Sequence, residues 1–337
     1  MSGIFISWTR ENGRTRDLAS ELGLEAVHIY SSGRFGLPGR YVRQARETRR
    51  VLRERAPKRV ALMLPPAPAL LALLGRLRPG AGLVVDAHTG FFLDPKWRWA
   101  AGWSLRLVRR MGATAIVTND HLRDLCSAAG VRAIVLQDPI LEHAPAASAG
   151  HVLCPLSYAN DEPVDEILEA ARSTPEIDWV LTGRAPEAVR ERAPANVRFS
   201  GFVDDAEYAR LLTTAGAVAA LTTRPHTMQR AGYEAFHEAV PQLTSDFPEL
   251  RGFYEDSARY ADPDPASIAS ELRALLRERE RFVERTLEVR ALRAAEQRAA
   301  LDEVRTALGG RPRTPGPDDS EPDDVEDRNP GSRNGAD

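Results

Sequence analysis

Residues 197–223 read VRFSGFVDDAEYARLLTTAGAVAALTT, and residues 230–246 read RAGYEAFHEAVPQLTSD. Short apolar runs alternate in these stretches with longer amphipathic segments that have the period of a helix. Near-continuous apolar runs are typical of strands buried on both faces of a parallel sheet. Strands that alternate with helices predict right-handed βαβ units. We therefore expect strands at 197–201, 217–222 and 241–245, and helices at 205–215 and 232–239.

The same alternation extends outward from this stretch in both directions and forms two sets. In the first set, strands are expected at 3–8, 26–30, 59–64, 82–87, 114–118 and 132–136, with helices at 15–22, 40–55, 67–77, 96–111 and 119–129. In the second set, the further strands are 151–156, 178–183 and 258–262, and the further helices are 163–173, 186–193 and 265–280.

The alternation stops at 137–150, where Pro, Ala, Ser and Gly dominate, and this change predicts a linker. The expected fold class is α/β, with two Rossmann-like domains at 1–140 and 151–280, a linker at 141–150 and a cleft between the domains. A long charged helix is expected at 281–308. Residues 309–337 are acidic and rich in Pro and Gly, so we expect a disordered tail.

Composition excludes several classes of protein. The 337 residues are 43% hydrophobic and 28% charged, which is typical of a globular chain that can bury large cores. Two distant cysteines give no disulfide framework, and the N-terminus has no basic n-region of a signal peptide, so a cytoplasmic location is expected. The apolar run 60–75 is shorter than a membrane span and contains three prolines, so a strand, a turn and a helix are expected there.

Charge is divided unequally along the chain. The formal charge of residues 1–140 is +11 and that of the remaining residues is −14, which together give the net charge of −3. A basic half favours phosphates, anionic lipid or nucleic acid as partners. A solvated Arg-rich surface without a partner is the alternative.

The motifs in 151–280 resemble the donor domain of family 4 glycosyltransferases, which have the GT-B fold. Phe199, Gly201, Phe202 and Val203 match a strand that ends in F-x-G-F/Y-V. Glu234-Ala235 and Pro241 match the family's E-A-x5-P. The N-terminal half is similar only in layout and around one histidine.

The resemblance implies a nucleotide-diphosphate sugar held in the cleft as substrate, with retaining chemistry and neither a metal nor a cofactor. In the family, two glutamates spaced E-x7-E flank the donor. Glu234 matches the second, which contacts the ribose, and His226 stands at the position of the first, which contacts the sugar. We list Glu234 and His226 as donor contacts, and Glu234 also as a catalytic candidate.

The diphosphate requires positive charge, and the family's basic pair is absent from the loop PLSYANDEPVDE at 155–166. Arg184, Arg224 or Arg230 would then neutralise the phosphates. Backbone N–H groups near the expected helix start would add to this charge. The candidates for this role are Thr227, Gln229, Arg230 and Gly232.

In the first half, VVDAHTGFF ends an expected buried strand with Asp86 and His88. The resemblance implies that His88 lies near the reacting sugar, which makes it a catalytic candidate, and a helix cap or a hydrogen-bonded loop histidine is the alternative. Asn12 and Gly13 follow the first strand where relatives carry a Gly-rich acceptor loop, with Arg10 and Arg14 beside them. We expect Asn12, Gly13 and Asp86 on the acceptor side.

Three tryptophans, Trp97, Trp99 and Trp103, alternate with basic residues within 96–110. Trp99 and Trp103 are i,i+4 neighbours, and we expect them in the core. Trp flanked by basic residues also suits a bilayer interface, so a peripheral location on the inner face of the plasma membrane stays open.

The sequence as a whole predicts a transferase that moves a sugar from a nucleotide-sugar donor to a lipid-linked or polysaccharide acceptor, with no nucleic acid partner. The alternative is a catalytically weak or inactive GT-B-shaped binding or scaffold protein of a polysaccharide pathway. A nucleotide-sugar epimerase fits less well, because the glutamate constellation of such an enzyme is not evident. The base, the sugar, the acceptor and the oligomeric state are not determined by the sequence.

Overall fold

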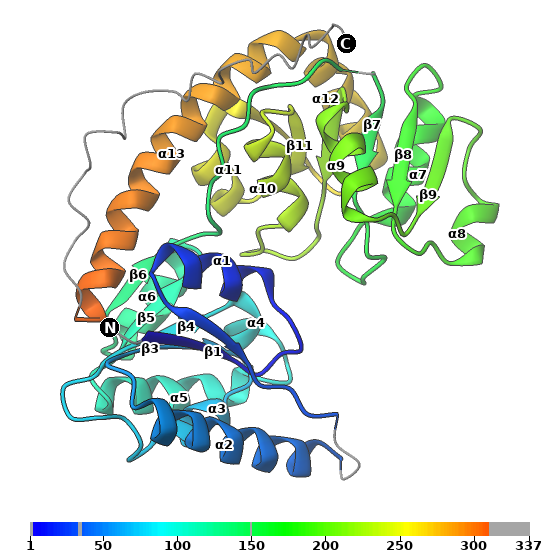
Figure 1. Ribbon diagram of the computed structural model, residues 1–337. Helices are drawn as coiled ribbons and strands as arrows, with labels where there is room; N and C mark the ends of the chain where they lie inside the picture. Colours follow the sequence, from blue (N-terminus) through cyan, green and yellow to red (C-terminus); the bar gives the residue numbers. More distant parts are fainter. Residues whose placement is uncertain (1–2, 33–35, 149, 310–337) are drawn as a thin grey trace, which may run out of the picture.

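The computed structural model describes residues 3–32, 36–148 and 150–309, which form two α/β domains, a linker and a long C-terminal helix (Figure 1). The tail expected at 309–337 lies outside these residues, apart from Gly309. The first sheet has the strand order β2-β1-β3-β4-β5-β6 and the second β12-β11-β10-β7-β8-β9, and all the pairings are parallel.

The twelve expected strands are confirmed, each within two residues at either end. In the first sheet they are β1 (Gly3–Ser7), β2 (Glu25–His28), β3 (Arg59–Leu64), β4 (Gly82–Ala87), β5 (Thr114–Val117) and β6 (Ala133–Val135). In the second sheet they are β7 (Val152–Cys154), β8 (Trp179–Thr182), β9 (Val197–Gly201), β10 (Ala217–Ala220), β11 (Gln242–Ser245) and β12 (Ala258–Ala261).

The helices follow the expected alternation, with three additions. The expected ones are α1 (Gly13–Glu21), α2 (Gly36–Arg55), α3 (Ala69–Leu73), α5 (Arg98–Arg110), α6 (Asp120–Ala128), α7 (Val164–Ser173), α8 (Glu187–Glu191), α9 (Asp205–Thr213), α10 (Arg230–His237), α12 (Pro265–Arg277) and α13 (Arg279–Ala307). The sequence did not predict α4 (Thr89–Leu93), α11 (Pro248–Tyr254) or the 3-10 turn η1 (Glu255–Ser257).

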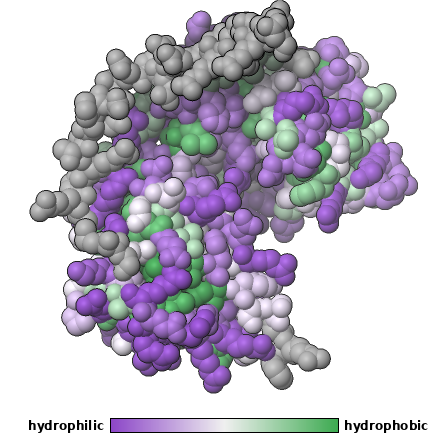
Figure 2. Space-filling view, viewed as in Figure 1, coloured by the Kyte–Doolittle hydropathy of each residue, from purple (hydrophilic) through white to green (hydrophobic). Residues whose placement is uncertain are grey.

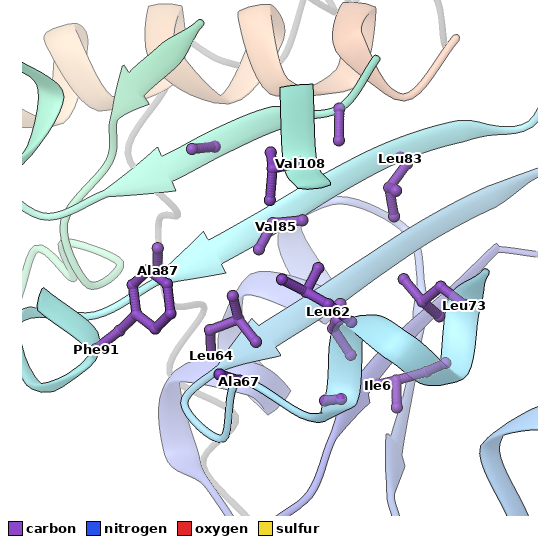
Figure 3. Close-up of a cluster of buried hydrophobic side chains, with 14 of the residues drawn as sticks. Ile6, Leu62, Leu64, Ala67, Leu73, Leu83, Val85, Ala87, Phe91 and Val108 are labelled. Carbon is purple, nitrogen blue, oxygen red and sulfur yellow. The ribbon is translucent and has the colours of Figure 1, made fainter. Parts of the chain in front are cut away.

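Alternate residues of the strands face opposite sides of each sheet, and both sides are covered by helices. Leu62 and Leu64 of β3 and Val85 of β4 face the side that α2, α3 and α5 cover (Figure 3). Residues between them in the sequence, such as Ala61 and Val84, face α1 and the end of α13. Burial on both sides explains why these strands are apolar throughout.

Helix α13 connects the two domains. Phe282, near its start, belongs to the core of the second domain, and Leu301 and Val304, near its end, belong to the core of the first. The helix extends along both domains in Figure 1. It also holds the segment that follows β6, because Gln297 donates from Nε2 to the Asp138 carbonyl (2.7 Å) and accepts from the Ile140 amide (2.9 Å).

The expectation that Trp99 and Trp103 lie in the core is wrong. Their exposed fractions are 78% and 46%. The residues of α5 that face the sheet include Ala100, Ser104 and Val108. This buried row lies one residue further along the chain than the row that contains Trp99 and Trp103. The i,i+4 spacing predicted a shared helix face correctly, but it could not show which face the sheet covers.

Candidate active site

A cleft of about 470 Å³ lies where the carboxyl ends of the two sheets face each other, and the surface is hollowed between the domains in Figure 2. The strand order reverses between β1 and β3 in the first sheet and between β7 and β10 in the second. Ligands of open parallel sheets bind beside such reversals. The cleft is lined by Asn12, Gly13, Arg14, His88, Thr89, Gly90, Leu93, Asp94, Pro95, Thr118, Asp138, Arg224, Thr227, Met228, Arg230 and Tyr233.

The floor of the cleft contains a buried ion-pair network centred on Arg14. Its guanidinium bonds Asp86 (3.1 Å), Asp138 (2.8 Å) and the Leu136 carbonyl (2.6 Å). Burial alone would raise the pKa of the Asp86 carboxyl, but the charge of Arg14 and the nearby His88 ring hold this pKa below its usual range. Burial likewise opposes the charge on Arg14, yet the two aspartates raise its pKa. Asp86 and Arg14 are therefore both ionised at neutral pH.

His88 lies above this network, between β4 and α4. Its Nε2 is 2.9 Å from Asp86 Oδ2, and the residue lines the cleft. An ionised Asp86 favours the tautomer with the proton on Nε2, which leaves Nδ1 as the nitrogen that can accept from a hydroxyl group. Asp86 was expected on the acceptor side, but it is fully buried. Its carboxylate therefore supports the His88 ring from beneath.

Asn12 and Gly13 form the wall of the cleft at the start of α1. The Asn12 side chain accepts from the Thr15 amide (2.8 Å) and so caps the helix. A Cβ at Gly13 would lie 2.5 Å from Nη1 of Arg230, which reaches across from the second domain. The absence of a side chain at Gly13 thus leaves room for the Arg230 guanidinium here.

Arg230 and Arg224 provide positive charge from the second domain. Arg230 begins α10, and its Nε donates to Glu234 Oε1 (2.7 Å), which raises the pKa of the arginine. Arg224 is exposed, 3.8 Å from Asp161. Thr227 also lines the cleft, whereas Arg184 lies 5.3 Å above the Phe202 ring, outside the cleft.

Glu234 lies on the other side of Arg230, in a second cavity of about 480 Å³. It is the fifth residue of α10 rather than part of the first turn, because the helix begins two residues earlier than expected. The Tyr208 hydroxyl donates to Glu234 Oε2 (2.5 Å). Burial, followed by the charge of Glu234, raises the pKa of Tyr208. Arg230 and Tyr233 line both cavities, so the two are adjacent.

His226 is not brought to the cleft. It lines a third cavity of about 740 Å³, where its ring stacks on that of His121 at 3.8 Å and its Nδ1 contacts Glu249. Its carbonyl accepts from Thr89 Oγ1 (3.1 Å) and Asn119 Nδ2 (3.4 Å) of the first domain. Its backbone has a left-handed conformation, with φ +58°. The structure therefore places His226 in a contact between domains.

The last two donor candidates have packing roles. Gln229 occupies the N-cap position of α10 without a side-chain capping bond, and its Nε2 donates to the Leu221 carbonyl (2.7 Å), which fixes the helix to the end of β10. Gly232 is buried where a Cβ would be 2.8 Å from the Tyr254 hydroxyl and 3.0 Å from Gln242 Oε1. Neither residue lines the cleft.

Sequence reasoning missed Thr118, Asp138 and Tyr208. Thr118 directly follows β5, so its place at a carboxyl strand end was a usable signal. Asp138 lay in the stretch assigned to the linker, and nothing local marks Tyr208. Among the residues that the structure describes, no three His, Cys, Asp or Glu side chains form a group that could hold a metal ion. No helix within the described ranges is long and apolar enough to cross a membrane.

No family model and no curated protein matches the sequence. Solved structures do match. HepE of Anabaena, in complex with UDP and glucose, superposes with a TM-score of 0.67 at 13% identity, over 92% of this chain and 99% of HepE. Sucrose-phosphate synthase of Thermosynechococcus elongatus gives 0.66 at 12%, over 92% and 98%. A Listeria monocytogenes protein described as a UDP-N-acetylglucosamine 2-epimerase gives 0.58 at 12%, over 86% and 91%. The chain has the two-domain GT-B fold.

Proposed function

We propose that the chain is a glycosyltransferase that binds a nucleotide-diphosphate sugar across the cleft. The observation that carries the proposal is the convergence of basic and hydrogen-bonding groups from both domains on one cavity. The first domain contributes the start of α1 and His88, and the second contributes Arg224 and Arg230. The GT-B neighbours, one of them in complex with UDP and glucose, support this proposal.

The diphosphate is assigned to the part of the cleft that the start of α1, Arg224 and Arg230 line together. A helix N-terminus directs N–H groups at an anion, and an arginine offers a planar fork to phosphate oxygens. The sugar would then face His88 and Thr118, and the nucleoside would extend past Arg230 toward Glu234. This arrangement joins the two adjacent cavities into one elongated donor site.

The chemistry assigned to the chain is retaining transfer of the family 4 kind, without a metal. The departing diphosphate develops charge, which the helix start, Arg224 and Arg230 would stabilise in place. Asp86 and Arg14 hold His88 so that Nδ1 can orient a sugar or acceptor hydroxyl. The acceptor we propose is lipid-linked or a growing surface polysaccharide, reached from the cytoplasm.

A binding or scaffold role is the second candidate, and two observations favour it. The loop between β7 and α7 has no Lys or Arg, and His226, at the position of the family's first glutamate, lies outside the cleft. Both features would weaken catalysis, and Arg224 and Arg230 would still supply positive charge for binding the donor.

Titration calorimetry with UDP- and GDP-sugars tests donor binding, and NMR of the sugar anomers tests turnover with EDTA present. Arg230→Met should weaken donor binding by about ten- to a hundred-fold, because a charged hydrogen bond contributes roughly 1.5–3 kcal/mol. Arg184→Met, which changes an exposed arginine outside the cleft, is the matched control. Turnover supports the transferase, binding without turnover supports the scaffold, and no binding of any nucleotide sugar refutes both.

A further inference from the structure

One face of the first domain is formed by the outer sides of α2, α3 and α5, which we call the α2–α5 face. The three helices cover the same side of the first sheet and lie together at the bottom of Figure 1. Arg49 Nη2 of α2 donates to the Leu71 carbonyl of α3 (3.2 Å), and the Tyr41 and Trp97 rings are 6.2 Å apart. The face is therefore one continuous surface.

Large apolar side chains gather on this face. Six of the eleven exposed large hydrophobic residues in the described part of the chain lie on or directly beside these three helices: Leu37, Val42, Leu71, Leu74, Trp99 and Trp103. Trp99 and Trp103 are one turn apart on α5. The indole Nε1 of Trp99 already donates to the Lys96 carbonyl (2.8 Å), so its ring can enter an apolar phase without an unsatisfied N–H.

The same face is strongly basic. Helix α2 contains seven arginines and two glutamates, and α5 contains four arginines and no acidic residue. The two helices thus carry a charge of +9, most of the +11 of residues 1–140. Exposed positions such as Arg46, Arg53, Arg106 and Arg110 place this charge outward. The edge of the domain along α2 is hydrophilic in Figure 2.

The face also adjoins the mouth of the cleft. Leu93, Asp94 and Pro95 line the cleft, and Lys96 and α5 follow them directly in the sequence. The Lys96 amide donates to Asp94 Oδ1 (2.8 Å), which fixes this short connection. Only a short segment therefore separates α5 from the cleft. A surface that contacts α5 would hold an embedded substrate close to the mouth of the cleft.

We propose that the α2–α5 face binds the surface of an anionic phospholipid bilayer and so presents the cleft to a lipid-linked acceptor. The acceptor part rests on the proposed function, whereas membrane binding itself does not. Arginines alone would suit nucleic acid equally well. The exposed Trp and aliphatic side chains among them match the boundary between headgroups and hydrocarbon, where Trp and Leu enter and Arg meets lipid phosphate.

The test uses the full chain with vesicles of phosphatidylcholine containing 30% phosphatidylglycerol, and with pure phosphatidylcholine vesicles for comparison. We expect co-sedimentation with the anionic vesicles only, and a loss of more than ten-fold in partitioning between low and physiological salt, because each basic residue near the surface contributes about five-fold. Tryptophan emission should shift to the blue on binding.

Variants assign the binding to this face. Trp99→Ala/Trp103→Ala should weaken partitioning by at least ten-fold and remove the blue shift, and Arg106→Gln/Arg110→Gln should weaken partitioning and flatten the salt dependence. Phe202→Ala, an equally exposed aromatic residue of the second domain, is the matched control and should change neither readout.

Three results would overturn the proposal: no sedimentation at low salt, equal losses in the Phe202→Ala control, or binding to a duplex oligonucleotide that displaces the protein from vesicles through the same arginines. Donor calorimetry on the Trp99→Ala/Trp103→Ala variant keeps the two proposals apart. Normal donor binding with lost vesicle binding supports the membrane face. In the parent chain, vesicle binding without binding of any nucleotide sugar leaves the membrane face standing and refutes the proposed function.

Discussion

Replacing Asp86 by Asn tests the network beneath the candidate active site. The substitution keeps the shape of the side chain and removes its negative charge. Asp86 is fully buried, and its carboxylate meets the buried guanidinium of Arg14 (3.1 Å) and Nε2 of His88 (2.9 Å). The variant therefore leaves Arg14 as a buried cation that has lost its buried counter-charge.

The cost follows from what remains around Arg14. Breaking a buried ion pair by removing one partner costs about 3–5 kcal/mol. Asp138 and the Leu136 carbonyl still meet the guanidinium in the variant, so the lower end, about 3 kcal/mol, is expected. For a domain of this size, about 1 kcal/mol lowers Tm by roughly 2–4 °C. The first domain of Asp86→Asn should thus unfold roughly 6–12 °C below the parent.

Differential scanning calorimetry can follow this domain, and Asp165→Asn is the matched control because Asp165 pairs with Arg192 (2.7 Å) on the exposed surface. An exposed pair contributes at most about 1 kcal/mol, so the control should unfold close to the parent. Adding Arg14→Met to Asp86→Asn should restore part of the loss, because no uncompensated buried charge then remains. A Tm of Asp86→Asn within 2 °C of the parent would contradict the assignment of Arg14 and Asp86 as a coupled buried pair.

Three further predictions concern the donor, pH and the tail. Glu234→Gln should weaken nucleotide-sugar binding by about ten-fold or more in calorimetry if the carboxylate meets the ribose, and unchanged affinity would mean that Glu234 only supports Tyr208 and Arg230. Burial, with help from neighbouring cations, lowers the pKa of His237 to about 4, so the folded state stays neutral while the unfolded state is protonated near pH 6.5. Stability should therefore fall by up to roughly 3 kcal/mol from pH 6.5 to pH 4, and chemical denaturation of His237→Asn at both pH values should show a smaller fall. Ending the chain after Gly309 should leave Tm unchanged, because the acidic tail has few apolar residues to bury, and a clear drop would show that it docks on the body.

The sequence determined the strands and most helices because their signals are local. A strand buried on both faces must be apolar over several consecutive residues, and 59–64 and 82–87 have that composition wherever they lie. The helices missed, α4 and α11, have five and seven residues. Helices this short depend on their neighbours for stability, so their own sequence carries little signal.

The candidate site was predicted where residues follow strand ends, as with His88, Gly13 and Arg230, because parallel strands bring their carboxyl ends to one edge. The sequence could not show which side chains from distant parts of the chain form ion pairs with each other. Arg14 meets Asp86 and Asp138 from positions 72 and 124 residues away, and only the folded sheet brings these charges together.

The tertiary structure alone also decided which way side chains face. The period of a helix shows that Trp99 and Trp103 share a side, but the sheet decided that this side is exposed. The spacing from Glu234 predicted His226 as a sugar contact, whereas the folded chain stacks its ring on His121 in the cavity next to the cleft. Spacing fixes positions along an element, whereas contacts between elements fix what each position meets.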